Sequence, residues 1–121
     1  MTRQELFTWI RQQYGTEPEY PWHDWNAVLR HNDNNKWYGV VLEVSADKLG
    51  LSEAGIIDVL NVKCDPQWRD FWRSTFTSVV PAYHMNKTHW VTVLLDGTLP
   101  EPELFWLLEE SYSLSNGNQF S

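Results

Sequence analysis

Cysteine is nearly absent from this sequence, since Cys64 is the only one in 121 residues. The chain can therefore form neither an intrachain disulfide nor a cysteine-based zinc site. A small domain without disulfides fits a reducing compartment. The first residues lack a signal-peptide pattern, and no apolar run approaches the roughly 20 residues that span a bilayer. We expect a cytoplasmic protein with no membrane association.

Basic residues are also scarce, with nine Lys and Arg against sixteen Asp and Glu, for a net charge of −7. Such a charge repels polyanions on average. The charges are unevenly distributed, because residues 63–90 contain four basic and two acidic side chains. From Asp96 onwards there are five acidic side chains and no basic one. The acidity is thus concentrated near the C-terminus, and residues 63–90 are mildly basic.

Motifs for catalysis and for metal binding are missing. The sequence has neither a nucleophile-elbow pattern nor a glycine-rich phosphate loop. Cys64 precedes a helix start, but its apolar neighbours favour a buried, inert thiol. His84 and His89 could chelate a metal only with further ligands, and the other histidines are scattered along the chain. We expect no catalytic residue, no cofactor and no metal.

Periodic segments predict three helices and five strands in one domain spanning residues 1–121. In chain order these are a helix at Arg3–Tyr14, strands at Trp22–Arg30, Trp37–Ser45 and Gly55–Lys63, a helix opened by Asp65-Pro66, strands at Val79–Met85 and His89–Leu95, and a helix at Pro100–Tyr112. Short hairpin connections favour an α+β fold in the order α-β-β-β-α-β-β-α. We expect a mainly antiparallel sheet with helices packed on one side, and a frayed tail over residues 113–121.

Local signals support these helices. Thr2 and Glu5 form a capping box before the first, and Asp65 with Pro66 suits the N-terminus of the second. Helical spacing predicts an aromatic stripe of the second helix on the sheet and a buried face of the third. The stripe comprises Trp68, Phe71, Trp72 and Phe76, and the buried face comprises Leu104, Phe105, Leu108 and Tyr112.

Four segments, taken in order, resemble the MmcQ/YjbR family over essentially the whole chain. They are Glu19-Tyr20-Pro21-Trp22, Leu60-Asn61-Val62-Lys63-Cys64-Asp65-Pro66, Tyr83-His84-Met85-Asn86-Lys87-Thr88-His89-Trp90, and Thr92-Val93-Leu94-Leu95-Asp96-Gly97 through Glu110-Ser111-Tyr112. The resemblance implies a CyaY-like fold, also described as a double-wing arrangement. The family has no established biochemical activity, and a DNA-binding role has been suggested for it from shape. This sequence differs in its longer polar first hairpin and its acidity.

The most informative segment is Tyr83–Trp90, which we expect to form a hairpin that binds a ligand. Asn86 suits a positive backbone angle in the turn, and Lys87 would project into solvent. His84 and His89 would lie on facing strands. These side chains offer an ammonium, an amide and two imidazoles to an anionic group.

Two arginines could add positive charge to this hairpin, since Arg69 and Arg73 lie one turn apart on the second helix. The alternative is structural. In that interpretation Asn86 only makes the turn, Lys87 is a solvated tip, and Tyr83 and Trp90 pack across the strands.

The aromatic residues near the first hairpin also have two interpretations. Trp22 and Trp25, with Trp37 and Tyr38 opposite, could form a stacking platform for bases. Packing is the other role, and it is favoured because a stacking platform normally accompanies a basic groove.

The sequence thus favours a monomeric binding module that recognises DNA or a small anion through the Tyr83–Trp90 segment. The alternative is a protein-interaction domain that uses surface tryptophans and the acidic C-terminal helix.

Overall fold

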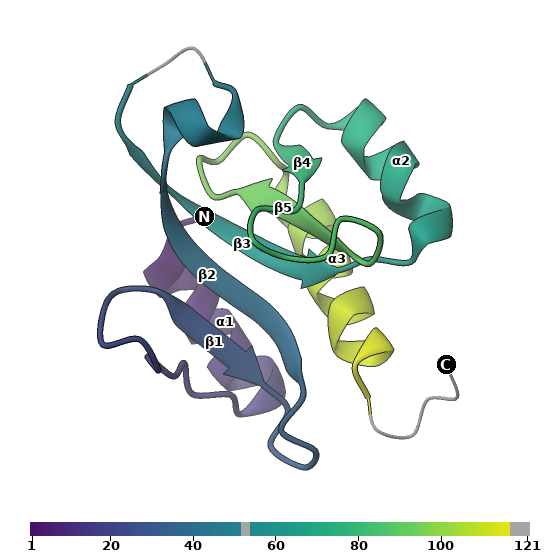
Figure 1. The fold of residues 1–121 in the computed structure, drawn as a ribbon. Helices are drawn as coiled ribbons and strands as arrows, with labels where there is room; N and C mark the ends of the chain where they lie inside the picture. The colour runs from purple at the N-terminus through teal and green to yellow at the C-terminus, as the bar shows by residue number, and fades with distance from the viewer. Residues whose placement is uncertain (52–53, 117–121) are drawn as a thin grey trace.

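The computed structural model describes residues 1–51 and 54–116 (Figure 1). Its elements in chain order are α1 (Arg3–Tyr14), β1 (Ala27–Arg30), β2 (Trp37–Ser45), the 3-10 helix η1 (Ala46–Leu49), β3 (Ile56–Lys63), α2 (Pro66–Thr75), β4 (Val79–Pro81), β5 (Trp90–Leu94) and α3 (Glu101–Leu114). The strands form one antiparallel sheet in the order β1-β2-β3-β5-β4. The predicted α+β fold and element order are confirmed.

The inner face of the sheet carries the main core, which α1 and α3 cover (Figure 1). Alternate residues of neighbouring strands, such as Leu60, Val62, Val91 and Val93, point into it and are fully buried. This alternation follows from the two-residue period of a strand. The core therefore lies between the sheet and the two long helices.

The start of α1 agrees with the sequence prediction. Thr2 Oγ1 accepts a hydrogen bond from Glu5 N, and Glu5 Oε1 accepts one from Thr2 N. Gly15 ends the helix in the left-handed conformation at φ 65°. Arg3, in the first turn, is buried and forms an ion pair with Asp58 of β3 at 2.8 Å. This pair attaches the helix to the sheet.

Two strands are shorter than predicted. The first begins at Ala27, not at Trp22, because His23 has a φ of 60° and Asp24 Oδ1 accepts a hydrogen bond from Asn26 N. β4 ends at Pro81, not at Met85. Residues 82–89 are instead a long loop, so His84 and His89 do not lie on facing strands.

The predicted aromatic stripe of α2 is only partly buried. Trp72 packs against Phe76 and against Trp106 of α3, with ring centroids 5.3 Å apart in both pairs. Trp68 and Phe71, in contrast, are each half-exposed. The helix lies beside β4, at an edge of the sheet, so only part of its surface meets the core.

The final helix begins at Glu101 and extends to Leu114. Leu104 and Leu108 are buried as predicted, whereas Phe105 and Tyr112 are half-buried and Leu107 takes a core position. The remainder of the expected tail, residues 117–121, lies outside the described residues, as do residues 52 and 53 between η1 and β3.

The outer face of the sheet carries a second, smaller apolar cluster. It is built on Val44, Val59 and Leu94, against which Leu42, Leu49, Leu51, Ile57, Val80 and Tyr83 pack. No long helix covers this face in the described part of the chain. η1 and the 82–89 loop partly cover it instead, since Leu49 and Tyr83 pack against the cluster.

Candidate functional site

The 82–89 loop folds over the outer face and is attached there by buried hydrogen bonds. Asn61 of β3 donates from Nδ2 to Tyr83 O at 2.9 Å, and Thr92 of β5 donates from Oγ1 to Asn61 Oδ1. Tyr83 N donates to Thr92 Oγ1 at 2.8 Å. Asn61 and Thr92 are both fully buried. Two strands thus fix the start of the loop through side chains rather than through a sheet ladder, which is why β4 ends early.

Asn86 builds the second half of the loop through its side chain. Its Oδ1 accepts hydrogen bonds from Thr88 N at 2.8 Å and from His89 N at 3.3 Å. Its carbonyl oxygen accepts from Trp90 N at 3.0 Å. The expected positive backbone angle is found at His84 instead, with φ 61°. Asn86 is therefore a turn-forming residue, as the structural interpretation proposed.

Two cationic residues line one pocket at a flank of the loop. Lys87 and Lys48 of η1 both line a pocket of about 230 Å³, together with Leu49, Val80, Pro81, Ala82 and Tyr83. We call it the lysine pocket. No carboxylate lines it, and both lysines are exposed. Lys48 was missed at the sequence level, because it follows β2 and is 39 positions away from Lys87 in the chain.

Of the two predicted arginines, Arg69 reaches the loop. Its Nη1 donates to Thr88 O at 3.3 Å, while its Nε pairs with Asp70 at 3.2 Å. Arg73 is exposed one turn further along α2, and no hydrogen bond or ion pair joins it to the loop within the residues described. His89 is exposed, and its carbonyl accepts a hydrogen bond from Cys64 N at 2.8 Å. Four of the six predicted residues therefore lie in the loop and Arg69 contacts it, but the set does not converge on one pocket.

A second pocket lies on the other flank of the loop. It measures about 310 Å³ and is lined by Trp22, Asn26, Trp37, Val40, Leu42, His84 and Met85. We call it the tryptophan pocket. Its Trp22 and Trp37 rings meet edge to face, with centroids 6.0 Å apart and planes at 88°. The aromatic residues noted near the first hairpin thus include two that border a cavity.

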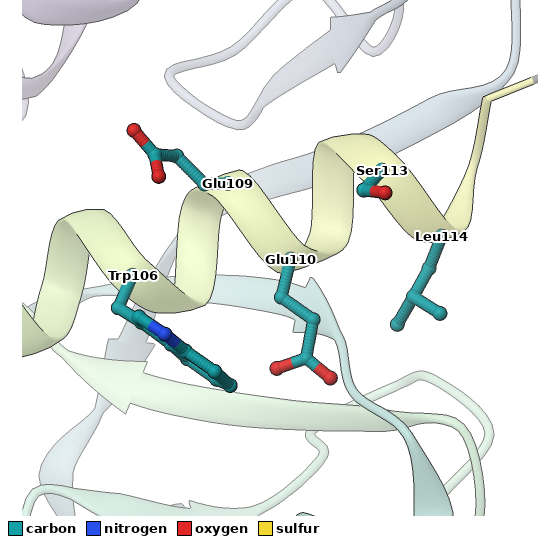
Figure 2. Close-up of a pocket in the computed structure, with 5 residues that line it drawn as sticks. All are labelled: Trp106, Glu109, Glu110, Ser113 and Leu114. Carbon is teal, nitrogen blue, oxygen red and sulfur yellow. The ribbon is translucent and has the colours of Figure 1, made fainter.

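A third hollow lies along α3, on the surface of the helix (Figure 2). Trp106, Glu110 and Leu114 project from one side of the helix, and Glu109 projects from another. Burial, together with the nearby Asp65 carboxylate, raises the pKa of Glu110. Its Oε1 accepts from Asp65 N at 3.4 Å, and Oε2 has no hydrogen-bond partner.

Cys64 lies beside this carboxylate and is buried. Burial, with the neighbouring Glu110 and Asp65 carboxylates, raises the pKa of its thiol to about 12. A thiolate is the reactive form of cysteine, so this residue has the character of a structural, unreactive thiol.

No group of three His, Cys, Asp or Glu side chains in residues 1–51 and 54–116 could hold a metal ion. No helix among these residues has the length and apolarity to cross a membrane.

The fold and the outer face of its sheet together define a class of small α+β domain. In this class an irregular loop is hydrogen-bonded to the outer face of a five-stranded antiparallel sheet. The YjbR family model matches residues 11–114, and the chain belongs to that family. The protein YyaQ of Bacillus subtilis is 43% identical over 117 residues, which cover 95% of this chain and 98% of YyaQ. The YjbR protein of Escherichia coli K12 is 38% identical over 53 residues, 44% of this chain and 45% of that protein. Both relatives are named as uncharacterised proteins.

Solved structures agree with this assignment. A crystal structure of a Pseudomonas syringae protein has a TM-score of 0.91 and 38% identity, covering 96% of this chain and all of that one. The Deinococcus radiodurans protein DR2400 has a TM-score of 0.74 and 28% identity, with coverage of 99% and 82%. The fold is thus shared with proteins from distant bacteria.

Proposed function

We propose that this protein is a binding module that recognises a small anionic ligand through the 82–89 loop. The observation that carries the proposal is the lysine pocket, where Lys87 and Lys48 line one hollow without a carboxylate. Two ammonium groups that share a concave site attract an anion more strongly than either does alone. Arg69, bonded to Thr88 O, adds a guanidinium beside the same loop.

The architecture around the lysines supports this assignment. The Asn61–Thr92–Tyr83 hydrogen bonds attach the start of the loop to the sheet, and the Asn86 side chain shapes its second half. A preorganised loop lowers the entropy that binding must overcome. His84 and His89 are exposed on the same loop and can donate or accept hydrogen bonds at its rim. Asn86 has a supporting role, and Arg73 remains a peripheral candidate.

A compact anion suits the site better than a long duplex. DNA binders usually present a broad basic face, and the basic residues here surround one loop on a chain of net charge −7. Binding of DNA, the role suggested for the family, is therefore a separate outcome of the test.

The test is a calorimetric titration of the protein with pyrophosphate at low ionic strength. Lys87→Ala and Lys48→Ala should each weaken binding about fivefold, since one charge-assisted contact is worth roughly 1 kcal/mol at an exposed site. Lys36→Ala is the matched control, because Lys36 is an exposed lysine outside the pocket, and its affinity should stay unchanged. Equal losses in all three variants, or no binding, would refute the proposal. Tighter binding of duplex DNA than of pyrophosphate, with a steep salt dependence, would favour the nucleic-acid version.

A second candidate function is protein interaction, which a different surface favours. Trp68 and Phe71 of α2 and Trp106 of α3 are each about half-exposed. Exposed aromatic residues of this kind are enriched in protein interfaces. Glu109 and Glu110 supply negative charge next to Trp106. This candidate predicts a co-purifying partner that is lost with Trp68→Ala or Trp106→Ala and retained with Lys87→Ala. Loss of the partner with Lys87→Ala would contradict it.

A further inference from the structure

The tryptophan pocket has the features of a preformed ligand site that the anion proposal does not use. Its volume of about 310 Å³ falls at the lower end of the range for small-molecule sites. Val40 and Leu42 of β2 provide an apolar floor, and Trp22, Trp37 and Met85 provide large side walls. Such a cavity suits one small ring system rather than a long chain.

Backbone strain is concentrated around this pocket. Within the described residues, three positions other than glycine have a positive φ, namely His23, Asn35 and His84. His84 lines the pocket and His23 follows the lining residue Trp22. The left-handed conformation costs a non-glycine residue roughly 1–2 kcal/mol, and strain of this kind is often found at ligand sites. His84 thus combines a left-handed backbone with a place in the pocket lining.

The geometry of the two tryptophans indicates what they would hold. Their edge-to-face contact, with centroids 6.0 Å apart, leaves no gap between the rings for a guest. A methylated ammonium, which requires several ring faces around it, therefore fits poorly. A flat ring that stacks on one exposed indole face fits well, and Trp22 is 47% exposed. The His84 imidazole, which has a ring contact with Tyr83 and no hydrogen bond in the described structure, can bond to a ring heteroatom.

The tryptophan pocket and the lysine pocket are adjacent, although no residue lines both. Tyr83 lines the lysine pocket and His84 lines the tryptophan pocket, and their ring centroids are 4.0 Å apart. A ligand with a flat ring and a nearby anionic group could therefore occupy both pockets at once. The chemistry of the two pockets is complementary to the two parts of such a molecule.

We propose that the tryptophan pocket binds the planar heteroaromatic ring of a mononucleotide-like ligand, whose anionic group reaches Lys48 and Lys87. The second half of this statement rests on the proposed function, whereas the ring assignment stands on the pocket itself. In this proposal the ring stacks on the indole of Trp22, and the His84 imidazole forms a hydrogen bond with the edge of the ring.

The experiment uses the indole N–H signals of the eight tryptophans in a ¹H–¹⁵N correlation spectrum, assigned by single substitutions. The intact protein is titrated separately with adenosine 5′-monophosphate, adenosine, inorganic phosphate and choline. The monophosphate and adenosine should shift the Trp22 and Trp37 signals. The Trp68 and Trp106 signals, from residues outside the pocket, should not move.

Substitutions then test the roles of the side chains. Trp22→Ala should weaken binding of the monophosphate about tenfold or more, as expected for loss of one stacking partner. Trp25→Ala is the matched control, because Trp25 is in the same segment, is 66% exposed and does not line the pocket. Its affinity should change less than about twofold. Lys48→Ala and Lys87→Ala should weaken the binding of adenosine 5′-monophosphate and leave the affinity for adenosine unchanged.

The possible failures are distinguishable. If neither purine ligand shifts the Trp22 and Trp37 signals, or if choline alone does, the ring assignment is wrong. Equal losses in Trp22→Ala and Trp25→Ala would also overturn it. Lysine-dependent phosphate binding without purine binding would refute the ring assignment and leave the proposed function standing. If adenosine binding depends on Trp22 and neither lysine affects binding of the monophosphate, the ring assignment stands and the proposed function is refuted.

Discussion

Single residues in and beneath the 82–89 loop divide into those that hold its shape and those that it exposes to solvent. Asn61, Thr92 and Asn86 use their polar atoms internally, so they are positioning residues. Lys87 and His84 are exposed beside pockets and have polar atoms available for a ligand. A polar side chain in a family motif can thus serve the backbone, and hydrogen-bond partners distinguish the two roles.

Glu110 gives a pH-dependent prediction for a single residue. Burial raises its pKa most, the hydrogen bond from Asp65 N partly opposes this shift, and the Asp65 carboxylate adds to it. The folded state therefore holds this proton more tightly than the unfolded state, and the resulting stability, full at low pH, is lost as the pH rises through the folded pKa. At pH 7 the carboxylate is charged, and its partial burial lowers the free energy of unfolding. Glu110→Gln should remove this cost and stabilise the protein by about 0.5 kcal/mol, a value reduced for partial exposure.

Urea unfolding at pH 7 and pH 4 measures this effect. The gain of Glu110→Gln should shrink towards pH 4, where the wild-type side chain increasingly binds its proton. Glu109→Gln is the control, since Glu109 is the exposed neighbour on the same helix, and it should show little gain. A Glu110→Gln variant that is less stable than wild type at pH 7 would contradict the explanation.

At the scale of elements, local sequence signals predicted what local physics determines. The capping box of α1, the Asp65 cap of α2 and the bounds of β2 all follow from near neighbours, and all are observed. The early end of β4 depends on Thr92 capturing Tyr83 N from another strand. That contact is visible only once the sheet is assembled, so an alternating apolar pattern overextends the strand.

The candidate site also combines residues that local sequence predicts with residues that only tertiary packing brings together. Lys87 and Arg69 were found because they lie in or near the motif segment. Lys48 and Trp37 were not assigned to one site with them, because the sheet order brings β2 and η1 beside the loop from distant parts of the chain. Which flank of a loop faces which pocket is a property of tertiary packing, and composition carries no information about it.

The attachment of the loop to the sheet can be tested with Asn61→Ala. This change leaves Tyr83 O without its donor and opens a small cavity at a fully buried position. We expect a loss of about 2–3 kcal/mol in the free energy of unfolding. Amide exchange in residues 82–89 should also accelerate under native conditions, because the loop loses its attachment.

Asn32→Ala provides the comparison for this variant. Asn32 is exposed and donates one bond of 3.3 Å to Gly15 O, so its loss should cost less than about 0.5 kcal/mol. If Asn61→Ala has the same small effect, or if the loop amides exchange at the wild-type rate, the loop does not depend on this network.

At the scale of the whole molecule, the sheet separates the charges. The acidic α3 covers the inner face, whereas the loop with Lys87 lies over the outer face. Charges on opposite sides of a sheet are screened strongly at physiological salt, where the Debye length is about 8 Å. Four of the five acidic side chains from Asp96 onwards belong to α3 and therefore lie on the side away from the loop. A local anion site is compatible with an acidic protein for this reason.

Arg3 has a guanidinium that joins three parts of the chain. From the first turn of α1 it donates to both carboxylate oxygens of Asp58 in β3, at 3.1 and 2.8 Å, and to the carbonyl oxygen of Trp25. Its side chain is 7% exposed. Arg3→Met should therefore leave the Asp58 carboxylate and the Trp25 carbonyl without this donor and destabilise the protein by about 2–3 kcal/mol.

Arg11→Met is the matched control for this prediction, because it makes the same change on the same helix. The Arg11–Glu17 pair has a similar distance, 3.1 Å, but both side chains are well exposed, so its loss should cost about 0.5 kcal/mol or less. Urea unfolding of both variants measures the difference. The indole signal of Trp22, three residues before Trp25, should shift in Arg3→Met and stay in place in Arg11→Met. Equal stabilities would show that Arg3 contributes no more than a surface ion pair, and that packing alone joins the helix, the sheet and the tryptophan segment.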